Sequence, residues 1–168
     1  MTMNSKKNFT AKHNSNLNPD ITIQQEITKL INNNRLPCKA AFKIAKKLGV
    51  SAKQVGNTAD ILNYRLIGCQ LGLFGYKRKK NKIILEDSAK NSSKDIPKDI
   101  PKDIPKDIID DNLPKGLKKA ITDTLDNKKL KCKDCWDIAS RFKISRIAAG
   151  RVCNSMNIKI TECQLGAF

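Results

Sequence analysis

Histidine is almost absent from this chain. His13 is the single histidine among 168 residues, and it lies in the N-terminal tail. No apolar run approaches the roughly 18–20 residues that a membrane span needs, so we expect no membrane partner. The N-terminal stretch "MTMNSKKNFTAKHNSNLNP" has no apolar core of the kind found in secretory signals, and we therefore expect a cytoplasmic protein.

The sequence also lacks the residue constellations that catalysis requires. It contains no nucleophile placed beside a base, no glycine-rich phosphate loop and no paired carboxylates at catalytic spacing. We therefore expect that the protein is not an enzyme.

Acidic residues are scarce relative to basic ones. The chain carries 33 Lys and Arg against 16 Asp and Glu, which gives a net charge of +17 and a pI of about 9.8. Such a balance favours polyanionic partners, of which nucleic acid ranks first; an anionic membrane surface ranks second and is not among the expected partners.

Two stretches of the chain repeat one another. "GCQLGLF" at 68–74 returns as "ECQLGAF" at 162–168, and an offset of 94 aligns 20–74 with 114–168 without a gap and with 16 identities. The sequence therefore predicts one module present twice. The predicted domains are a disordered basic tail at 1–19, a first module at 20–76, a flexible linker at 77–113 and a second module at 114–168.

The predicted linker contains the repeat "KDIPKDIPKDIPKDI". A proline at every fourth residue excludes a helix interior, because each proline removes a hydrogen-bond donor and clashes with the preceding turn. We expect an extended, solvated tether with a reach of about 35 Å.

Helical periodicity dominates each module. In the first module, helices are predicted to start after Asp20 as a cap, at Pro37 in the first turn, and after Ser51 as a cap. The β-prone stretch "YRLIGCQLGLFGY" follows, and it suits a small hairpin or an extended tail that packs on the helices.

The stretch "AFKIAKKLGVSAKQVGNTADIL" resembles the helix-turn-helix of DNA-binding regulators. Ala45 stands where the two helices cross, Gly49 stands in the turn, and Ser51 caps the next helix, while Val50 and Val55 are the apolar positions that fix the angle. The second module places Ala139, Lys143, Ser145, Ile144 and Ala149 at the same positions. The resemblance is to the helix-turn-helix and winged-helix superfamily. It implies a mostly α fold of two tandem trihelical modules, each with a short wing-like β-prone segment.

The resemblance also implies a function and a set of contact residues. A transcriptional regulator would use the two modules to contact neighbouring major-groove half-sites on double-stranded DNA. The outward side of each third helix supplies the expected base-reading residues: Lys53, Asn57, Asp60, Arg146, Arg151 and Asn154. Basic residues on and after each second helix are expected to contact phosphates: Lys39, Lys43, Lys46, Lys47, Lys133, Arg141 and Lys143.

Each third helix also contains an interior glycine, Gly56 or Gly150. A glycine inside a helix costs about 1 kcal/mol relative to alanine, so it needs a reason. Close approach to a phosphate is one interpretation, and close packing of the helix on its neighbour is the preferred one.

Four of the six cysteines recur in both modules, whereas Cys135 and Cys153 occur only in the second. The spacing "CKDC" is shared by zinc sites and redox pairs, but the first module has Ala41 opposite Cys135, so a complete site in each module is excluded. If the modules pair within the chain, one shared zinc site could form from Cys38, Cys69, Cys132 and Cys163. Buried cysteines that fill apolar gaps are the alternative. Two other functions stay open, namely a protein- or RNA-interaction adaptor and a cysteine-based metal or redox sensor.

Overall fold

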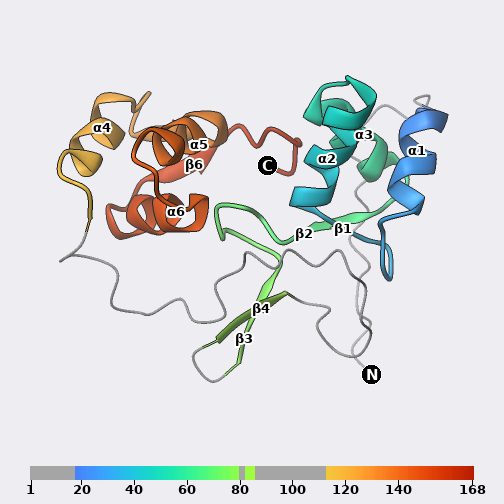
Figure 1. Cartoon of the computed structure of the whole chain (residues 1–168), viewed down its shortest axis with the longest axis horizontal. Coiled ribbons are helices and arrows are strands. Elements are labelled where there is room, and N and C mark those ends of the chain that lie inside the picture. The colour runs from blue at the N-terminus through green and yellow to red at the C-terminus, as the bar shows by residue number, and fades with distance from the viewer. Residues whose placement is uncertain (1–17, 80–81, 86–112) are drawn as a thin grey trace.

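A computed structural model gives the fold and describes residues 18–79, 82–85 and 113–168. This part of the chain is mostly helical, with short strands between the helices (Figure 1). The elements are α1 (Ile21–Thr28), β1 (Arg35–Pro37), α2 (Cys38–Leu48), α3 (Ala52–Ile61), β2 (Arg65–Ile67), β3 (Tyr76–Lys79), β4 (Lys82–Leu85), α4 (Leu117–Asp123), β5 (Lys129–Lys131), α5 (Cys132–Arg141), α6 (Arg146–Ser155) and β6 (Lys159–Thr161). The predicted disordered tail up to residue 17 and the KDIP repeats lie outside the described residues.

We call residues 18–67 the N-terminal half and residues 113–161 the C-terminal half. The seven residues that follow each half are the first tail, 68–74, and the second tail, 162–168. Among the described residues, no helix is both long enough and apolar enough to cross a bilayer.

The first helix of each half begins differently but buries the same positions. Asp20 caps α1, and its Oδ1 accepts a hydrogen bond of 3.0 Å from the backbone N–H of Ile23. α4 follows Gly116, which has a positive φ of 82° and supplies no side-chain cap. Ile27 of α1 and Ile121 of α4, which are equivalent in the repeat, are both fully buried.

The turn between α2 and α3 forms as the sequence predicts. Gly49 takes a left-handed conformation with a φ of 67°, and the Val50 N–H donates to the Ala45 carbonyl oxygen at 3.1 Å. Ser51 and Gln54 form a reciprocal capping box at the start of α3.

The turn between α5 and α6 keeps this path with weaker local signals. Lys143 stands in place of the glycine and still adopts a φ of 54°, which is unfavourable for a residue with a Cβ. Ser145 accepts a hydrogen bond from the Ala148 N–H at 3.1 Å, but Ala148 has no side-chain acceptor to return.

Left-handed residues recur at the same offset as the sequence repeat. The matched pairs with positive φ are Asn33/Asn127, Asn34/Lys128, Gly49/Lys143, Asn63/Asn157, Gly68/Glu162 and Gly72/Gly166. The two halves and their tails therefore follow the same backbone path, including at positions where the residue type has changed.

The strands differ from the predicted wing. β1 pairs in parallel with β2, and β5 pairs in parallel with β6, so each half closes with a short parallel pair that joins the start of its second helix to the end of its third. Each of these strands has three residues, which are too few for an alternation of apolar and polar side chains to reveal a strand in the sequence. An antiparallel hairpin does form, but it consists of β3 and β4 and occupies the beginning of the predicted linker. The start of the segment predicted as a flexible linker therefore contains a short hairpin.

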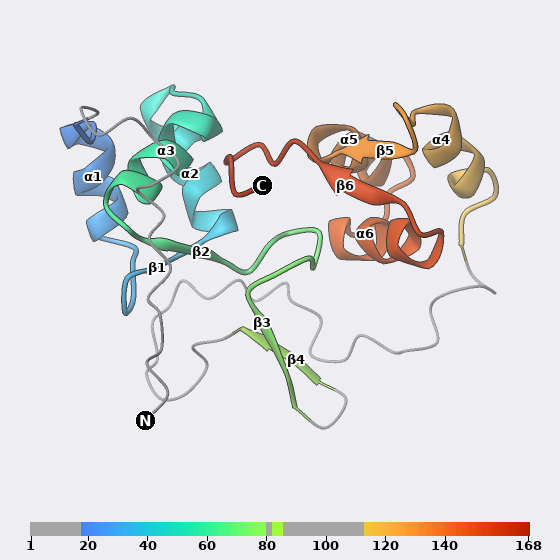
Figure 2. The same cartoon turned by 180° about the vertical axis from the view of Figure 1, so that it is seen from behind.

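The two tails cross between the halves. Cys69 and Leu71 of the first tail belong to the core of the C-terminal half, whereas Leu165 of the second tail belongs to the core of the N-terminal half. In Figures 1 and 2 the green chain after β2 runs to α6, and the red chain after β6 runs towards α2. The sequence predicts an extended tail that packs on the helices, and the structure shows on which ones: each tail packs on the helices of the opposite half, which apolar periodicity alone does not specify.

Aromatic residues that are equivalent in the repeat meet each other where the halves join. The rings of Phe42 and Trp136 have centroids 4.5 Å apart, and those of Phe74 and Phe168 have centroids 6.1 Å apart in an edge-to-face arrangement. A residue that contacts its own counterpart lies close to a two-fold axis. The halves are therefore related by a pseudo-two-fold axis that passes near both aromatic pairs.

Candidate nucleic-acid interface

The middle of each third helix is covered by the tail of the other half. A Cβ on Gly56 would overlap the carbonyl oxygen of Leu165, and a Cβ on Gly150 would overlap that of Leu71. The two interior glycines thus allow a backbone of the same chain to approach the helix. Of the two interpretations of these glycines, the structure supports close packing, because a tail of the same chain covers each glycine and leaves no room for a phosphate.

In α3 the three predicted base-reading residues have different environments. Lys53 is exposed, and Asn57 is half-buried, with its Oδ1 3.8 Å from where a Cβ on Gly166 of the second tail would lie. Asp60 is 4% exposed, so its carboxylate is not available to a base. Because Asp60 follows Gly56 by four residues, it lies on the same side of the helix as the second tail. The assignment of Asp60 as a base-reading residue is therefore corrected.

In α6 one of the two predicted base-reading arginines, Arg146, is part of the contact between the halves. The guanidinium of Arg146 lies 3.5 Å from the ring centroid of Trp136, and its Nη1 donates a hydrogen bond to Oε1 of Gln70 in the first tail. Burial lowers the pKa of Arg146 from its usual value. Arg151 is half-buried and Asn154 is exposed, so they are the more accessible of the predicted residues on this helix.

The predicted phosphate-contacting residues on α2 are largely accessible. Lys43 and Lys46 are exposed and Lys39 is half-buried. Lys47 is also exposed, but its Nζ lies 2.6 Å from Oε2 of Glu26, and hydrogen bonds from Lys29 and Lys47 lower the pKa of that carboxyl. The outer side of α2 together with the start of α3 therefore forms a basic surface, which we call the α2 surface: Lys39, Lys43, Lys46, Lys47 and Lys53.

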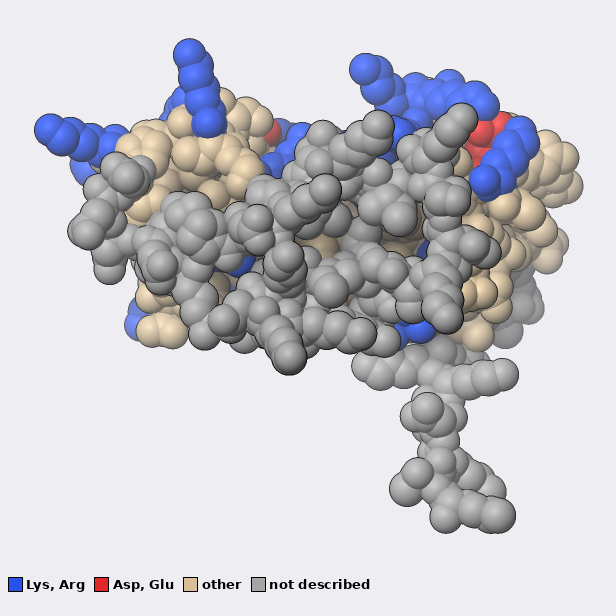
Figure 3. Space-filling view, turned by 60° about the horizontal axis from the view of Figure 1, so that its bottom comes forward, with Lys and Arg blue, Asp and Glu red and all other residues tan. Residues whose placement is uncertain are grey.

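The corresponding surface of α5 carries less free charge. Nζ of Lys133 lies 2.6 Å from Oδ2 of Asp137, which stands at the position of Lys43 in the repeat. The guanidinium of Arg141 lies 5.1 Å from the ring centroid of Phe142, and Lys143 is exposed in the turn. The two halves thus present unequal basic surfaces. Figure 3 shows Lys and Arg side chains gathered at both ends of the molecule, along one edge of that view.

The four repeated cysteines come from segments that meet near the pseudo-two-fold axis. Nε2 of Gln70 lies 3.8 Å from Sγ of Cys38, and Nε2 of Gln164 lies 3.8 Å from Sγ of Cys132. Burial raises the pKa of Cys38 to about 12 and also raises those of Cys69 and Cys132. In this structure these buried thiols therefore favour the neutral, protonated form.

The proposed shared zinc site is not formed in this structure. Within residues 18–79, 82–85 and 113–168, no group of three or more His, Cys, Asp or Glu side chains is arranged to hold a metal ion. Cys38, Cys69, Cys132 and the half-buried Cys163 are free thiols.

The two cysteines found only in the second half touch each other. Sγ of Cys135 lies 3.9 Å from Sγ of Cys153, and both side chains are buried between α5 and α6. The contact with Cys153 and burial both raise the pKa of Cys135. Alanines 41 and 59 occupy the equivalent places in the N-terminal half, which is consistent with cysteines that fill an apolar gap.

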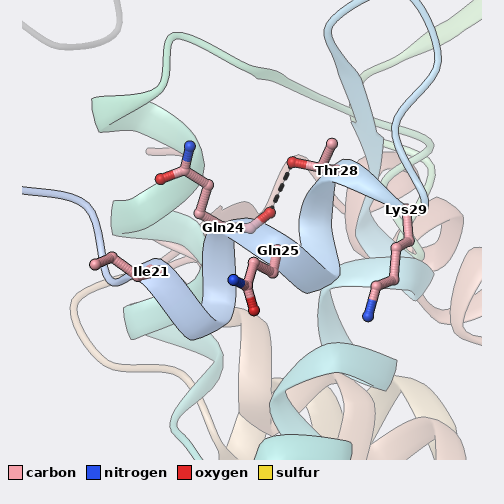
Figure 4. A pocket seen from close by; sticks show the side chains of 5 residues that line it. All are labelled: Ile21, Gln24, Gln25, Thr28 and Lys29. Atoms are coloured by element: carbon pink, nitrogen blue, oxygen red, sulfur yellow. Dashed lines mark hydrogen bonds between the residues drawn. The ribbon is translucent and has the colours of Figure 1, made fainter.

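A surface hollow lies on the outer side of α1 (Figure 4). It is lined by Ile21, Gln24, Gln25, Thr28 and Lys29. The hydroxyl of Thr28 donates to the carbonyl oxygen of Gln24 at 2.8 Å, and Nζ of Lys29 lies 2.7 Å from Oε1 of Glu26. Lys29 is the one charged residue that lines the hollow, and it is already paired with Glu26. The hollow therefore offers no charged group for binding or catalysis.

Sequence reasoning missed the residues that join the halves. The repeated "CQLG" contains Gln70, Leu71 and Leu165. This repeat indicated a duplication, but it did not indicate that each tail packs on the opposite half. An interior helix glycine in each copy was the second signal, because both glycines need a close neighbour.

Comparisons with protein-family models, with curated proteins and with solved structures find no match for this chain.

Proposed function

We propose that this chain binds double-stranded DNA through two helix-turn-helix units, α2–α3 and α5–α6, and acts as a transcriptional regulator. The observation that carries the proposal is the α2 surface in a chain of net charge +17. In the part of the chain that the structure describes, no ion pair is found for Lys43, Lys46 or Lys53. Lysines in this state are available to displace the counterions of a phosphate backbone.

Local geometry supports the choice of duplex DNA. The turn at Gly49 and the capping box at Ser51 join α2, which carries four of these lysines, directly to the start of α3, which carries Lys53. This order of elements lets one helix lie across the phosphate backbone while the next directs its N-terminal residues into the major groove.

Base contacts in this arrangement are few. Lys53 and part of Asn57 remain accessible on α3, and Arg151 and Asn154 remain at least partly accessible on α6. Asn pairs in a bidentate manner with adenine and Arg with guanine, so these four side chains provide a limited sequence readout. Most of the affinity is then expected from phosphate contacts, which makes binding strongly dependent on salt.

Fluorescence anisotropy with a labelled duplex tests the proposal. The full chain and the variant Lys43→Gln/Lys46→Gln/Lys53→Gln are titrated over a series of salt concentrations. We expect the slope of log affinity against log salt to fall by about 1 for each phosphate-contacting lysine that is removed.

A charge-matched control separates a local site from the overall charge. The variant Lys115→Gln/Lys129→Gln/Lys159→Gln removes three exposed lysines of the C-terminal half that are not predicted contacts. Equal losses in the two variants would show that binding follows net charge alone. Tighter binding to single-stranded RNA or to an acidic polypeptide than to duplex DNA would favour the adaptor function over the regulator.

A further inference from the structure

The contacts between the halves are reciprocal. Gly56 of α3 receives Leu165 of the second tail, and Gly150 of α6 receives Leu71 of the first tail. In the repeat, Gly150 is the counterpart of Gly56, and Leu165 is the counterpart of Leu71. Such exchange is the property of an isologous interface, in which one rotation of 180° interconverts the partners. The chain is therefore built as a two-fold dimer within one polypeptide.

Buried contacts fix this relation. Leu71 and Leu165 are both fully buried in the core of the opposite half, and Phe42 packs on Trp136. The relative orientation of α3 and α6 is consequently set by packing across the pseudo-two-fold axis. The length of chain between the halves does not set it.

We propose that the DNA target is a pair of half-sites in inverted orientation at one fixed spacing, and that the two half-sites differ in sequence. This inference rests on the proposed function. A protein with a two-fold axis matches a duplex whose half-sites are related by the local two-fold axis of DNA. Two modules on a free tether would instead accept direct repeats and variable spacing.

The half-sites are unlike because the accessible residues have diverged. Lys53 of α3 corresponds to Ile147 of α6, and Asn57 corresponds to Arg151. An asparagine favours adenine, whereas an arginine favours guanine. The backbone symmetry is thus retained while the readout differs between the halves.

Selection from random duplexes by the full chain tests this inference. The enriched half-sites are then synthesised in inverted and direct orientation, and with the spacer lengthened in single base-pair steps. We expect the inverted arrangement at one spacing to bind at least about tenfold tighter than the others, a difference of about 1.4 kcal/mol.

The outcomes distinguish this inference from the proposed function. Equal affinity for direct repeats, tolerance of several spacings, or duplex binding without any sequence preference overturns the inference and leaves DNA binding in place. Absence of salt-dependent duplex binding overturns both.

Two variants of the full chain locate the cause of the fixed spacing. Deleting two of the KDIP units should leave the preferred spacing unchanged, and a change in spacing would contradict the inference. Gly56→Ala/Gly150→Ala should relax the preference for one spacing, because it forces the tails off the third helices. Circular dichroism and thermal unfolding establish whether the double glycine variant is folded. If it is unfolded, the KDIP deletion variant alone decides whether linker length sets the spacing.

Discussion

At Gly56 and Gly150 a single hydrogen atom in place of a methyl group lets the two halves meet. Glycine inside a helix is about 1 kcal/mol less favourable than alanine, so an unconstrained helix gains from the substitution. Here the added Cβ would overlap a carbonyl oxygen of the opposite tail, and a backbone atom cannot move aside as a flexible side chain can. The close approach therefore outweighs the intrinsic preference for alanine.

Gly56→Ala and Gly150→Ala should each lower the free energy of unfolding by about 1–3 kcal/mol, which is the range for overpacked sites. Urea unfolding of each variant measures the change. Gly49→Ala is the control, because nothing lies within 4 Å of a Cβ at this position and only its left-handed backbone, with a φ of 67°, opposes a side chain. A gain in stability for either α3 or α6 variant would show that the tails are not seated on these helices.

Lys143 gives the opposite prediction. It adopts a φ of 54° in the turn where the N-terminal half has Gly49. Lys143→Gly should raise the free energy of unfolding by about 0.5–1 kcal/mol, because glycine relieves the left-handed backbone while it adds some entropy to the unfolded chain. The converse change, Gly49→Lys, should lower stability by a similar amount in the same urea titration. Two changes of the same sign would contradict this reading of the turn.

At the scale of elements, what could be predicted from sequence depended on how local the signal was. The path from α2 to α3 followed from Gly49, Ser51 and Gln54, which act on neighbouring backbone groups. The strands β1 and β2 could not be predicted, since each has three residues and its partner lies about thirty residues away. The predicted DNA-contacting residues show the same limit: Lys43 is exposed as expected, but Asp60 is buried.

The caps of α3 and α6 allow a test within one chain. Ser51 has a reciprocal partner in Gln54, whereas Ser145 faces Ala148 and is capped in one direction only. Ala148→Gln should complete the box and raise the thermal midpoint, with a gain of a few tenths to about 1 kcal/mol. Ala148→Leu is a control that adds bulk without an acceptor. An equal effect of glutamine and leucine would assign the gain to packing.

At the scale of the whole molecule, exchange makes each core a joint product of both halves. Leu165→Ala should lower the free energy of unfolding by about 2–5 kcal/mol, the range for a buried leucine. The diagnostic readout is amide hydrogen exchange. Protection should fall in α1 and α3, which lie in the half that does not contain the substituted residue. Loss confined to β6 and the second tail would contradict the exchange, and Leu71→Ala should give the mirror-image pattern.

The buried thiols predict a dependence of stability on alkaline pH. Burial raises the pKa of Cys38 to about 12 and raises those of Cys69 and Cys132, whereas thiols in the unfolded chain titrate near 8.5. Between these values the folded state binds more protons than the unfolded state, so stability is complete below about pH 8.5 and declines as the pH rises towards 12. Thermal midpoints measured from neutral to alkaline pH should fall less steeply in Cys38→Ala than in the parent chain. Parallel curves for the two proteins would contradict this assignment.

Exchange also bears on how the protein is made. Synthesis proceeds from the N-terminus, so α1, α2 and α3 leave the ribosome well before Leu165 does. Until then the surface at Gly56 has nothing to cover it, and the first tail has no α6 on which to dock. The core of the N-terminal half therefore cannot close until Leu165 has emerged, and the apolar surface that Leu165 covers stays exposed until then.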